Sequence, residues 1–437
     1  MRREFWGVQL LTLINSLAYY SLYWMAGPYL HDELGFDWPT VGWFGGLFVA
    51  LIASFSFICG MVTDRIGFRN GMLLGATSAL IGRAGLGALP FLSLGPPELR
   101  SYVIWALVLT ALGEAFLQPI IAAGTARFSS KEMRTTAFNT QVVVLQIGGG
   151  FLVAILVWIT RSVGESLSPI YFVASALSVP TALVAYLFMK DESPAASCEG
   201  VPAQQGPSRM VSSWTLLREI VREKSFWMLV ILLVILTGSR MAFYLQPLYV
   251  PYYMATLGRK VELGQLLLIN PTIIMVGLIL FNSTFDKIRP YARLTLWMGV
   301  IVGSVLVLAI PPQVLQLYGV GIDQAYYTMI IVQLVVFSVG EMLFSPSIKQ
   351  YIMRLAPIDK LTSYAGVLNL FVIPAKFLPP VVAGYLLAMY CPDGTRDRVL
   401  AGGIPYTESP QMMFVIMGMI LMTGPVFLLL AQRWYKR

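Results

Sequence analysis

The chain is a succession of long apolar segments separated by short polar loops. A helix that crosses a membrane needs about 20 mostly apolar residues, and windows of that width predict twelve spanning helices. Proline and glycine inside several windows fit membrane helices, because neighbouring helices there satisfy the freed backbone groups. The predicted spans cover residues 5–30, 41–61, 71–92, 102–123, 140–160, 169–189, 226–250, 263–282, 295–314, 326–349, 364–390 and 411–432.

Composition supports lipid as the main solvent. Of the 437 residues, 57% are hydrophobic and 12% are charged, whereas a soluble domain carries about 25% charged residues. The mean hydropathy is +0.72, so we expect no separate soluble domain. We also expect no cleavable signal peptide, because the first apolar segment runs at full length without a small-residue cleavage site. The scattered cysteines, Cys59, Cys198 and Cys391, predict neither a disulfide framework nor a metal or cofactor site.

The net charge of +8 reflects orientation in the membrane. With an even number of spans, both termini share one side. The loops on that side hold about twenty lysines and arginines, against about six in the opposite loops. Cytoplasmic loops carry this excess, so we expect a multi-pass protein of the inner or plasma membrane with both termini in the cytoplasm. The basic charge is therefore not a signal for nucleic-acid binding.

A polar interruption at residues 191–225 divides the chain into halves of six spans. Its first part, "DESPAASCEGVPAQQGPS", is typical of a flexible linker. Its second part, "SSWTLLREIVREK", alternates apolar and charged positions as an amphipathic helix on a membrane surface does. We therefore expect an amino-terminal bundle (1–190), a cytoplasmic linker (191–225) and a carboxyl-terminal bundle (226–437).

The loop between the second and third spans, "GMVTDRIGFRN", packs charges and glycines at fixed spacing. A degraded copy, "NSTFDKIRPYAR", follows in the second half, where Asp286 lies 222 positions after Asp64. The first loop resembles the G-x-x-x-D-R-x-G-R pattern of the major facilitator superfamily. That resemblance implies an all-α fold of two six-helix bundles and a charged latch that closes the cytoplasmic side; alternatively, the charges only set topology. The gating residues it implies are Gly60, Asp64, Arg65, Gly67, Arg69 and Asp286.

Five charged residues fall within apolar spans. Charges inside a bilayer are costly and usually line a pathway, so we expect them to face a shared central cavity; the alternative is buried pairs that fix helix packing. Three cations against two acids favour an anionic or zwitterionic solute. A buried carboxyl favours its neutral form unless a cation pairs with it, which makes both acids candidates for proton coupling. The five are Arg83, Glu114, Arg240, Glu341 and Lys376.

Neutral hydrogen-bonding groups in the spans are candidates for the rest of the cavity lining, although aromatic packing and helix–helix bonding would use the same residues. They are Tyr19, Tyr20, Tyr23, Asn15, Gln118, Gln246 and Asn369.

Three segments resemble the proton-dependent oligopeptide transporters: "NSLAYYSLY", "GEAFLQP" and "GEMLFSP". The resemblance implies that Glu341 binds a solute amino group. However, Thr12, Asn15 and Ser16 stand where that family has two acids and an arginine, and Gln118 stands in place of its lysine. Drug exporters carry a proline in a glycine-rich fifth span. Here "LQIGGGFLVAIL" has Gly148–Gly150 without it, so we expect these glycines to allow close helix approach.

These patterns predict a secondary transporter that moves a small anionic or zwitterionic organic solute (a peptide, amino acid or organic acid) by alternating access, with proton coupling. We expect it to act as a monomer. A proton-driven multidrug or lipid exporter and a non-transporting sensor are the alternatives. We expect no enzyme activity, because the sole histidine, His31, lies in an outer loop beside Asp32 and Glu33 without a nucleophile or metal cluster.

Overall fold

The computed structural model describes most of the chain. It covers residues 3–129, 134–164, 166–188, 222, 227, 230–231, 241–243, 245–247, 249–250, 262–285, 290–355, 373–392, 394–401 and 404–435. Four predictions fall elsewhere: the central linker with nearly all of its amphipathic helix, Arg240, Asp286 and Asn369 lie outside the described residues, as do the side chains of Asp64 and Arg65.

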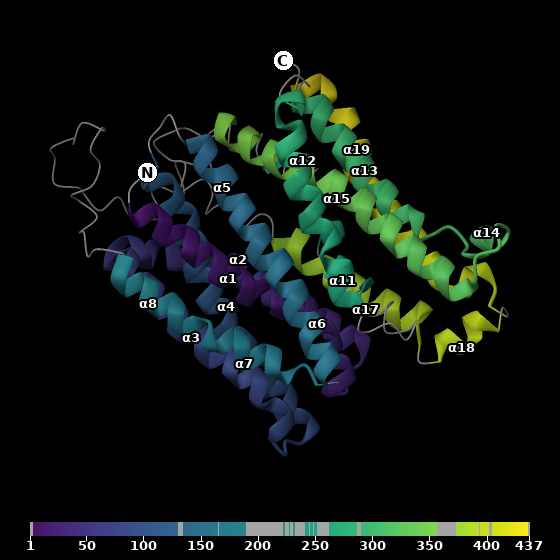
Figure 1. Cartoon of the computed structure of the whole chain (residues 1–437), viewed down its shortest axis with the longest axis horizontal. Coiled ribbons are helices and arrows are strands. Elements are labelled where there is room, and N and C mark those ends of the chain that lie inside the picture. The colour runs from purple at the N-terminus through teal and green to yellow at the C-terminus, as the bar shows by residue number, and fades with distance from the viewer. Residues whose placement is uncertain are drawn as a thin grey trace.

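Among the described residues, the amino-terminal bundle contains the six predicted spans as helical segments (Figure 1). Five of them are long and apolar enough to cross a membrane, and the first, Arg3–Pro28, is not among these five. The fifth and sixth spans consist of several consecutive segments. The first span is α1 (Arg3–Pro28), which continues into the π-helical η1 (Tyr29–Glu33), and the next three are α2 (Trp38–Ile66), α3 (Phe68–Ala88) and α4 (Pro96–Arg127). The fifth consists of α5 (Arg134–Gln146), η4 (Ile147–Leu152) and α6 (Val153–Val163). The sixth consists of α7 (Ser168–Ala176) and α8 (Ser178–Phe188).

The carboxyl-terminal bundle repeats this arrangement in the part that the structure describes. Its elements are α11 (Leu263–Leu267), α12 (Ile269–Phe285), α13 (Pro290–Val307), α14 (Gln313–Gln316), α15 (Ile322–Leu355), α17 (Ile373–Tyr390), α18 (Thr395–Leu400) and α19 (Pro410–Tyr435). Eight described helices are long and apolar enough to cross a membrane, and two shorter apolar helices match the eighth and ninth predicted spans. Most of the seventh predicted span lies outside the described residues.

Local sequence explains the helix boundaries. α2 starts after Asp37, whose backbone is extended, and Pro39 occupies its first turn, where a missing N–H is harmless. α2 ends at Ile66 and is followed by Gly67, whose φ of 85° is one that residues with a side chain rarely adopt. The predicted tight turn between the second and third spans is therefore present.

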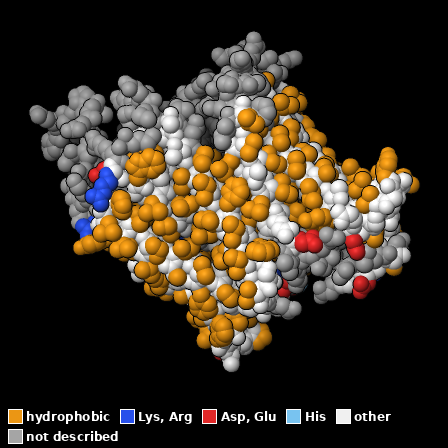
Figure 2. All heavy atoms as spheres, viewed as in Figure 1, with side chains coloured by type: hydrophobic (Ala, Val, Ile, Leu, Met, Phe, Trp, Pro, Cys, Tyr) orange, Lys and Arg blue, Asp and Glu red, His pale blue; other side chains and the backbone are white. Residues whose placement is uncertain are grey.

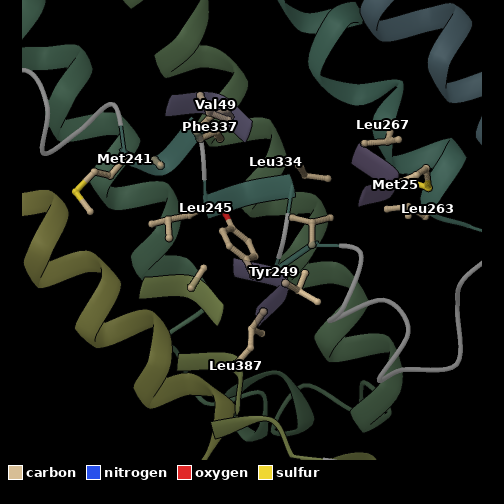
Figure 3. Close-up of a cluster of buried hydrophobic side chains, with 14 of the residues drawn as sticks. Met25, Val49, Met241, Leu245, Tyr249, Leu263, Leu267, Leu334, Phe337 and Leu387 are labelled. Atoms are coloured by element: carbon tan, nitrogen blue, oxygen red, sulfur yellow. The ribbon is translucent and has the colours of Figure 1, made fainter. Parts of the chain in front are cut away.

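Apolar side chains lie both inside and on the surface. Buried residues of both bundles form one cluster, which includes Met25, Val49, Tyr249 and Leu387 (Figure 3). On the outer face, hydrophobic side chains cover most of the described surface (Figure 2), and Trp105 and Leu430 are 69% and 70% exposed. A soluble protein rarely exposes such a continuous apolar surface, so this surface fits contact with lipid.

The two bundles meet at the end that lies away from the chain termini, which we call the far side. Both termini lie at the opposite end in Figure 1. On the far side, the first turns of α2 pack against α17: a Cβ added to Gly46 would come within 2.6 Å of the carbonyl oxygen of Phe377. Gly264 of α11 is equally close to α6, where a Cβ would lie 2.8 Å from the carbonyl oxygen of Ala154. The far side is therefore closed by direct backbone packing between the bundles.

Candidate functional site

The two intramembrane glutamates occupy equivalent places in an internal repeat. "GEAFLQP" in α4 and "GEMLFSP" in α15 each place a glutamate five residues before a proline, and Glu341 lies 227 positions after Glu114. The spacing is close to the 222 positions that separate the two loop motifs. The repeat is visible in the sequence as the same spacing from glutamate to proline in both segments. The structure shows that the two carboxylates nevertheless have different surroundings.

Glu114 is held in a closed polar network within the amino-terminal bundle. One carboxylate oxygen forms an ion pair with Nη2 of Arg83, whose side chain is 2% exposed while that of Glu114 is 0% exposed. The other oxygen accepts from Nδ2 of Asn15 at 3.1 Å and from Nε2 of Gln118 at 3.4 Å. The network therefore joins α1, α3 and α4.

Arg83 occupies a different position from the one expected for a solute-binding cation. It reaches Glu114 from α3, and its Nη1 donates to the carbonyl oxygen of Ala174 and to Oγ of Ser178, both at 3.1 Å. A guanidinium that is paired in this way within helix packing corresponds to the buried-pair alternative, although its Nε has no hydrogen-bond partner among the described residues. Arg83 is thus buried and paired in this structure, and its role in solute binding stays a prediction.

Glu341 has an amide partner rather than a cation among the described residues. Its Oε2 accepts from Nδ2 of Asn270 at 2.8 Å, and the same amide donates to Oγ of Ser338 at 3.2 Å. Glu341 and Asn270 are both partly exposed. Our sequence analysis missed Asn270, although an asparagine directly before Pro271 in an apolar span is a usable signal. A partly exposed carboxylate with one neutral donor can still accept a proton or an ammonium group.

Aromatic side chains on α1 contact one another. Tyr19 stacks on Tyr23 with ring centroids 5.7 Å apart and contacts Tyr20 edge to face at 5.0 Å. The hydroxyl of Tyr23 donates to the carbonyl oxygen of Phe243 at 3.4 Å, which connects α1 to the carboxyl-terminal half. These contacts place Tyr23 at the boundary between the bundles, and its role in lining a solute cavity stays a prediction.

The three consecutive glycines of η4 form a junction between helices. A Cβ on Gly148 would lie 2.5 Å from the carbonyl oxygen of Leu13, and one on Gly149 would overlap the ring of Tyr20. On Gly150 it would lie 2.5 Å from Cβ of Pro271 in the other bundle. The predicted close approach is confirmed, and it links α1 through η4 to the helix that carries Asn270.

An apolar cavity of about 50 Å³ lies on the far side between the bundles. Most of its lining comes from α1, η1 and α2, while Pro247 and Pro380 close it from the other half. Two of its polar atoms are already bonded: the hydroxyl of Tyr29 donates to the carbonyl oxygen of Leu86, and that of Thr110 to the carbonyl oxygen of Ala106 at 2.8 Å. Such a cavity suits an apolar group better than water.

The remaining predicted residues are placed as follows. Lys376 lies partly exposed on α17, and Gln246 is 4% exposed. In the predicted latch, a Cβ on Gly60 would meet open space, and the guanidinium of Arg69 lies 4.3 Å from the ring centroid of Tyr186. Because the side chains of Asp64 and Arg65 lie outside those described, the latch stays a prediction. Among the described residues, no group of three potential metal ligands occurs.

Comparisons with known proteins agree with this architecture. The family model of the Major Facilitator Superfamily matches residues 9–373. A search of curated proteins found no match. A solved POT family transporter in complex with a thioalcohol conjugated peptide superposes with a TM-score of 0.73 at 15% identity, covering 100% of this chain and 97% of that one.

Two further solved structures share the fold. A structure described as showing substrate recognition in proton dependent oligopeptide transporters has a TM-score of 0.69 at 17% identity, covering 98% of this chain and 99% of that one. A mutant of the nucleoside transporter NupG has a TM-score of 0.67 at 10% identity, with coverage of 98% and 99%. At these identities the structures demonstrate a common fold, while the family match extends over most of the sequence. The chain belongs to the Major Facilitator Superfamily, whose members are membrane transporters and not enzymes.

Proposed function

We propose that this protein moves a small zwitterionic or anionic organic solute across the membrane by alternating access, with a proton carried by Glu341. The observation that carries the proposal is the contrast between the two repeated glutamates. Glu114 is charge-paired with buried Arg83, whereas Glu341 is partly exposed and bonded to the amide of Asn270. Of our two proton-coupling candidates, Glu341 is therefore the better supported.

A zwitterion fits the charged residues of the carboxyl-terminal half, since Arg83 and Glu114 of the other half form a pair. The carboxylate of Glu341, held by Asn270, suits an ammonium group or a proton. Lys376 of α17 and Arg240 of the seventh predicted span supply positive charge for a carboxylate. Solved POT family transporters have been described with a peptide and with 5-aminolevulinic acid, which both carry an amine and a carboxylate. We extend that chemistry to this chain.

The direction of opening follows from the closed far side. The excess of basic residues in the loops near the termini places those loops in the cytoplasm. The conformation described here is then closed to the outside, and transport proceeds by rocking the bundles about the contacts that η4 and α6 make with α11 and α12. We place the protein in the inner or plasma membrane.

Uptake into liposomes tests the proposal. Purified protein is reconstituted with a proton gradient, and labelled Ala-Ala and 5-aminolevulinic acid are offered in turn. We expect gradient-driven accumulation of at least one probe, and its loss in Glu341→Gln with exchange of bound solute retained. Glu408→Gln, at an exposed site in the short helix Tyr406–Glu408, is the matched control and should transport normally.

Accumulation that ignores both the proton gradient and Glu341→Gln would overturn the proton assignment. A thermal-shift screen of peptides, amino acids, organic acids and cationic drugs separates the solute classes. Stabilisation by hydrophobic cations alone would instead support the exporter alternative.

A further inference from the structure

The Arg83–Glu114 pair dictates how two nearby amides are oriented. An ionised carboxylate can only accept hydrogen bonds. Glu114 forms an ion pair with Arg83, which identifies it as the carboxylate. Asn15 and Gln118 must therefore both turn their NH₂ groups toward Glu114, as the distances of 3.1 and 3.4 Å show. Their carbonyl oxygens then point away from the carboxylate.

These carbonyl oxygens are available as acceptors. Asn15 is 6% exposed, and its Oδ1 is buried without a hydrogen-bond partner among the described residues. A buried acceptor without a partner is unusual in folded proteins. Gln118 lies one turn beyond Glu114 and is exposed. The paired charges of Arg83 and Glu114 are thus buried, whereas Gln118 of the same network is exposed.

We propose that this amino-terminal wall, formed by Asn15 and Gln118, recognises hydrogen-bond donors on the solute, with Arg83 and Glu114 as positioning residues. The donor is a peptide N–H, a hydroxyl or an ammonium group. This inference rests on the proposed transport function and refines its solute class. The carboxylate of the solute then binds to the carboxyl-terminal half, because the amino-terminal wall offers acceptors in place of a cation.

Among the described residues around Glu114, no charged group other than Arg83 pairs with its carboxylate. α1 contributes the neutral Asn15, and α7 and α8 contribute the backbone of Ala174 and the hydroxyl of Ser178, both around Arg83. On α2, buried Cys59 packs with Ala115 and Phe116, the neighbours of Glu114 in sequence. These groups are uncharged as described, so the orientation of both amides depends on Arg83.

A pair of solute probes that differs in one donor tests the inference. Ala-Ala has a peptide N–H, and alanyl-lactate has an ester oxygen at the same place. We expect the native protein to transport Ala-Ala about tenfold better in kcat/KM, since a site built for a donor rejects the analogue that lacks it. Gln118→Met should remove most of this preference, and Gln118→Lys should weaken Ala-Ala transport further. Gln316→Met, at an exposed glutamine of α14, should keep the preference. Equal transport of both probes by the native protein would overturn the inference.

A second measurement needs no solute and so separates this inference from the proposed function. The infrared difference between the native protein and Glu114→Gln reports the protonation state of Glu114. We expect the carboxylate band, because Glu114 forms an ion pair with Arg83. A protonated Glu114 in the native protein would overturn the inference even if peptides are transported, because a carboxylic acid can donate to an amide oxygen. If neither probe is transported, the proposed peptide solute fails. The infrared result still decides whether Glu114 holds the carbonyl oxygens of the amino-terminal wall in the outward orientation.

Discussion

Gly42 of α2 and Gly384 of α17 face each other across the two bundles so closely that a Cβ added to either would lie 3.1 Å from the Cα of the other. The same added atoms would overlap the carbonyl oxygens of Pro380 and Trp38. A helix pair that approaches with backbone against backbone needs small residues at the crossing. This crossing is what keeps the far side closed.

Gly42→Ala should therefore shift the protein toward the conformation that is open on the far side. The added methyl cannot be accommodated without separating α2 from α17, and overpacking of this kind costs about 1–3 kcal/mol. Distances between spin labels at the far ends of α2 and α17 should lengthen and broaden. Gly45→Ala is the control, since its Cβ would make an ordinary 3.4 Å contact with Pro380. An unchanged distance distribution in Gly42→Ala would show that the crossing does not hold the closed state.

Arg83 and Glu114 should couple strongly in a double-mutant cycle of stability. Removing one partner of a buried pair leaves an uncompensated charge and costs about 3–5 kcal/mol, whereas replacing both by apolar residues is often neutral. We expect Arg83→Met to destabilise the protein in this range and Arg83→Met/Glu114→Met to recover most of the loss. The comparison uses thermal unfolding in one detergent. Additive losses in the double variant would mean that the pair contributes no mutual stabilisation.

Gly150→Ala should slow transport through contact with the opposite bundle. Its methyl would meet the ring of Pro271 at 2.5 Å, one residue from the Asn270 that holds Glu341. The swap Gly150→Ala/Pro271→Gly moves the side-chain atoms from one helix to the other and should restore much of the rate. Gly149→Ala, which would instead meet Tyr20 of the same bundle, should not be rescued by Pro271→Gly. Rescue of both variants would point to a general loosening rather than to this contact.

Glu33 should make stability depend on pH. It lies beyond the first span in η1, where it accepts from the backbone N–H of Leu167 and from Oγ of Ser166. Burial raises the pKa of Glu33, partly offset by these hydrogen bonds and by Arg161. A raised folded-state pKa means that the stabilising contribution is complete below the unfolded value of about 4.3 and is lost as the pH rises through the folded-state pKa.

We therefore expect Glu33→Gln to gain in melting temperature relative to the native protein as the pH increases from 4 to 7. Glu98→Gln is a suitable control, because Glu98 caps a helix at an exposed site. Its carboxylate accepts a hydrogen bond from the backbone N–H of Gly95 at 3.1 Å. A difference between native protein and Glu33→Gln that stays constant over this range would contradict the assigned pKa direction.

The fold was predictable because lipid imposes simple rules on sequence. Apolar length indicated the spans, and Gly67 marked a turn that the structure shows with a positive φ. The triple glycine was also interpreted correctly, since close approach needs only the absence of a side chain. Its π-helical form, and the fact that Gly150 faces the other bundle while Gly148 faces α1, depend on tertiary packing and could not be derived from periodicity.

The site was less predictable, since a charged residue in a span indicates neither its partner nor its direction. Arg83 and Glu114 both satisfied the pattern of a pathway residue, but they satisfy each other. Asn270 carried no charge and escaped notice, although it is the group that holds Glu341. Which helix face lies toward the other bundle is decided by contacts between residues far apart in sequence, and a single sequence does not contain that information directly.

The crossing of Gly42 with Gly384 has a consequence for the environment in which such a protein can work. The crossing joins backbone atoms by van der Waals contact and carries no ionisable group. A change in pH therefore titrates no group at the crossing, and a change in salt concentration screens no charge there. A barrier of this kind stays shut while conditions on its exposed side fluctuate, and it yields only when the helices themselves are drawn apart.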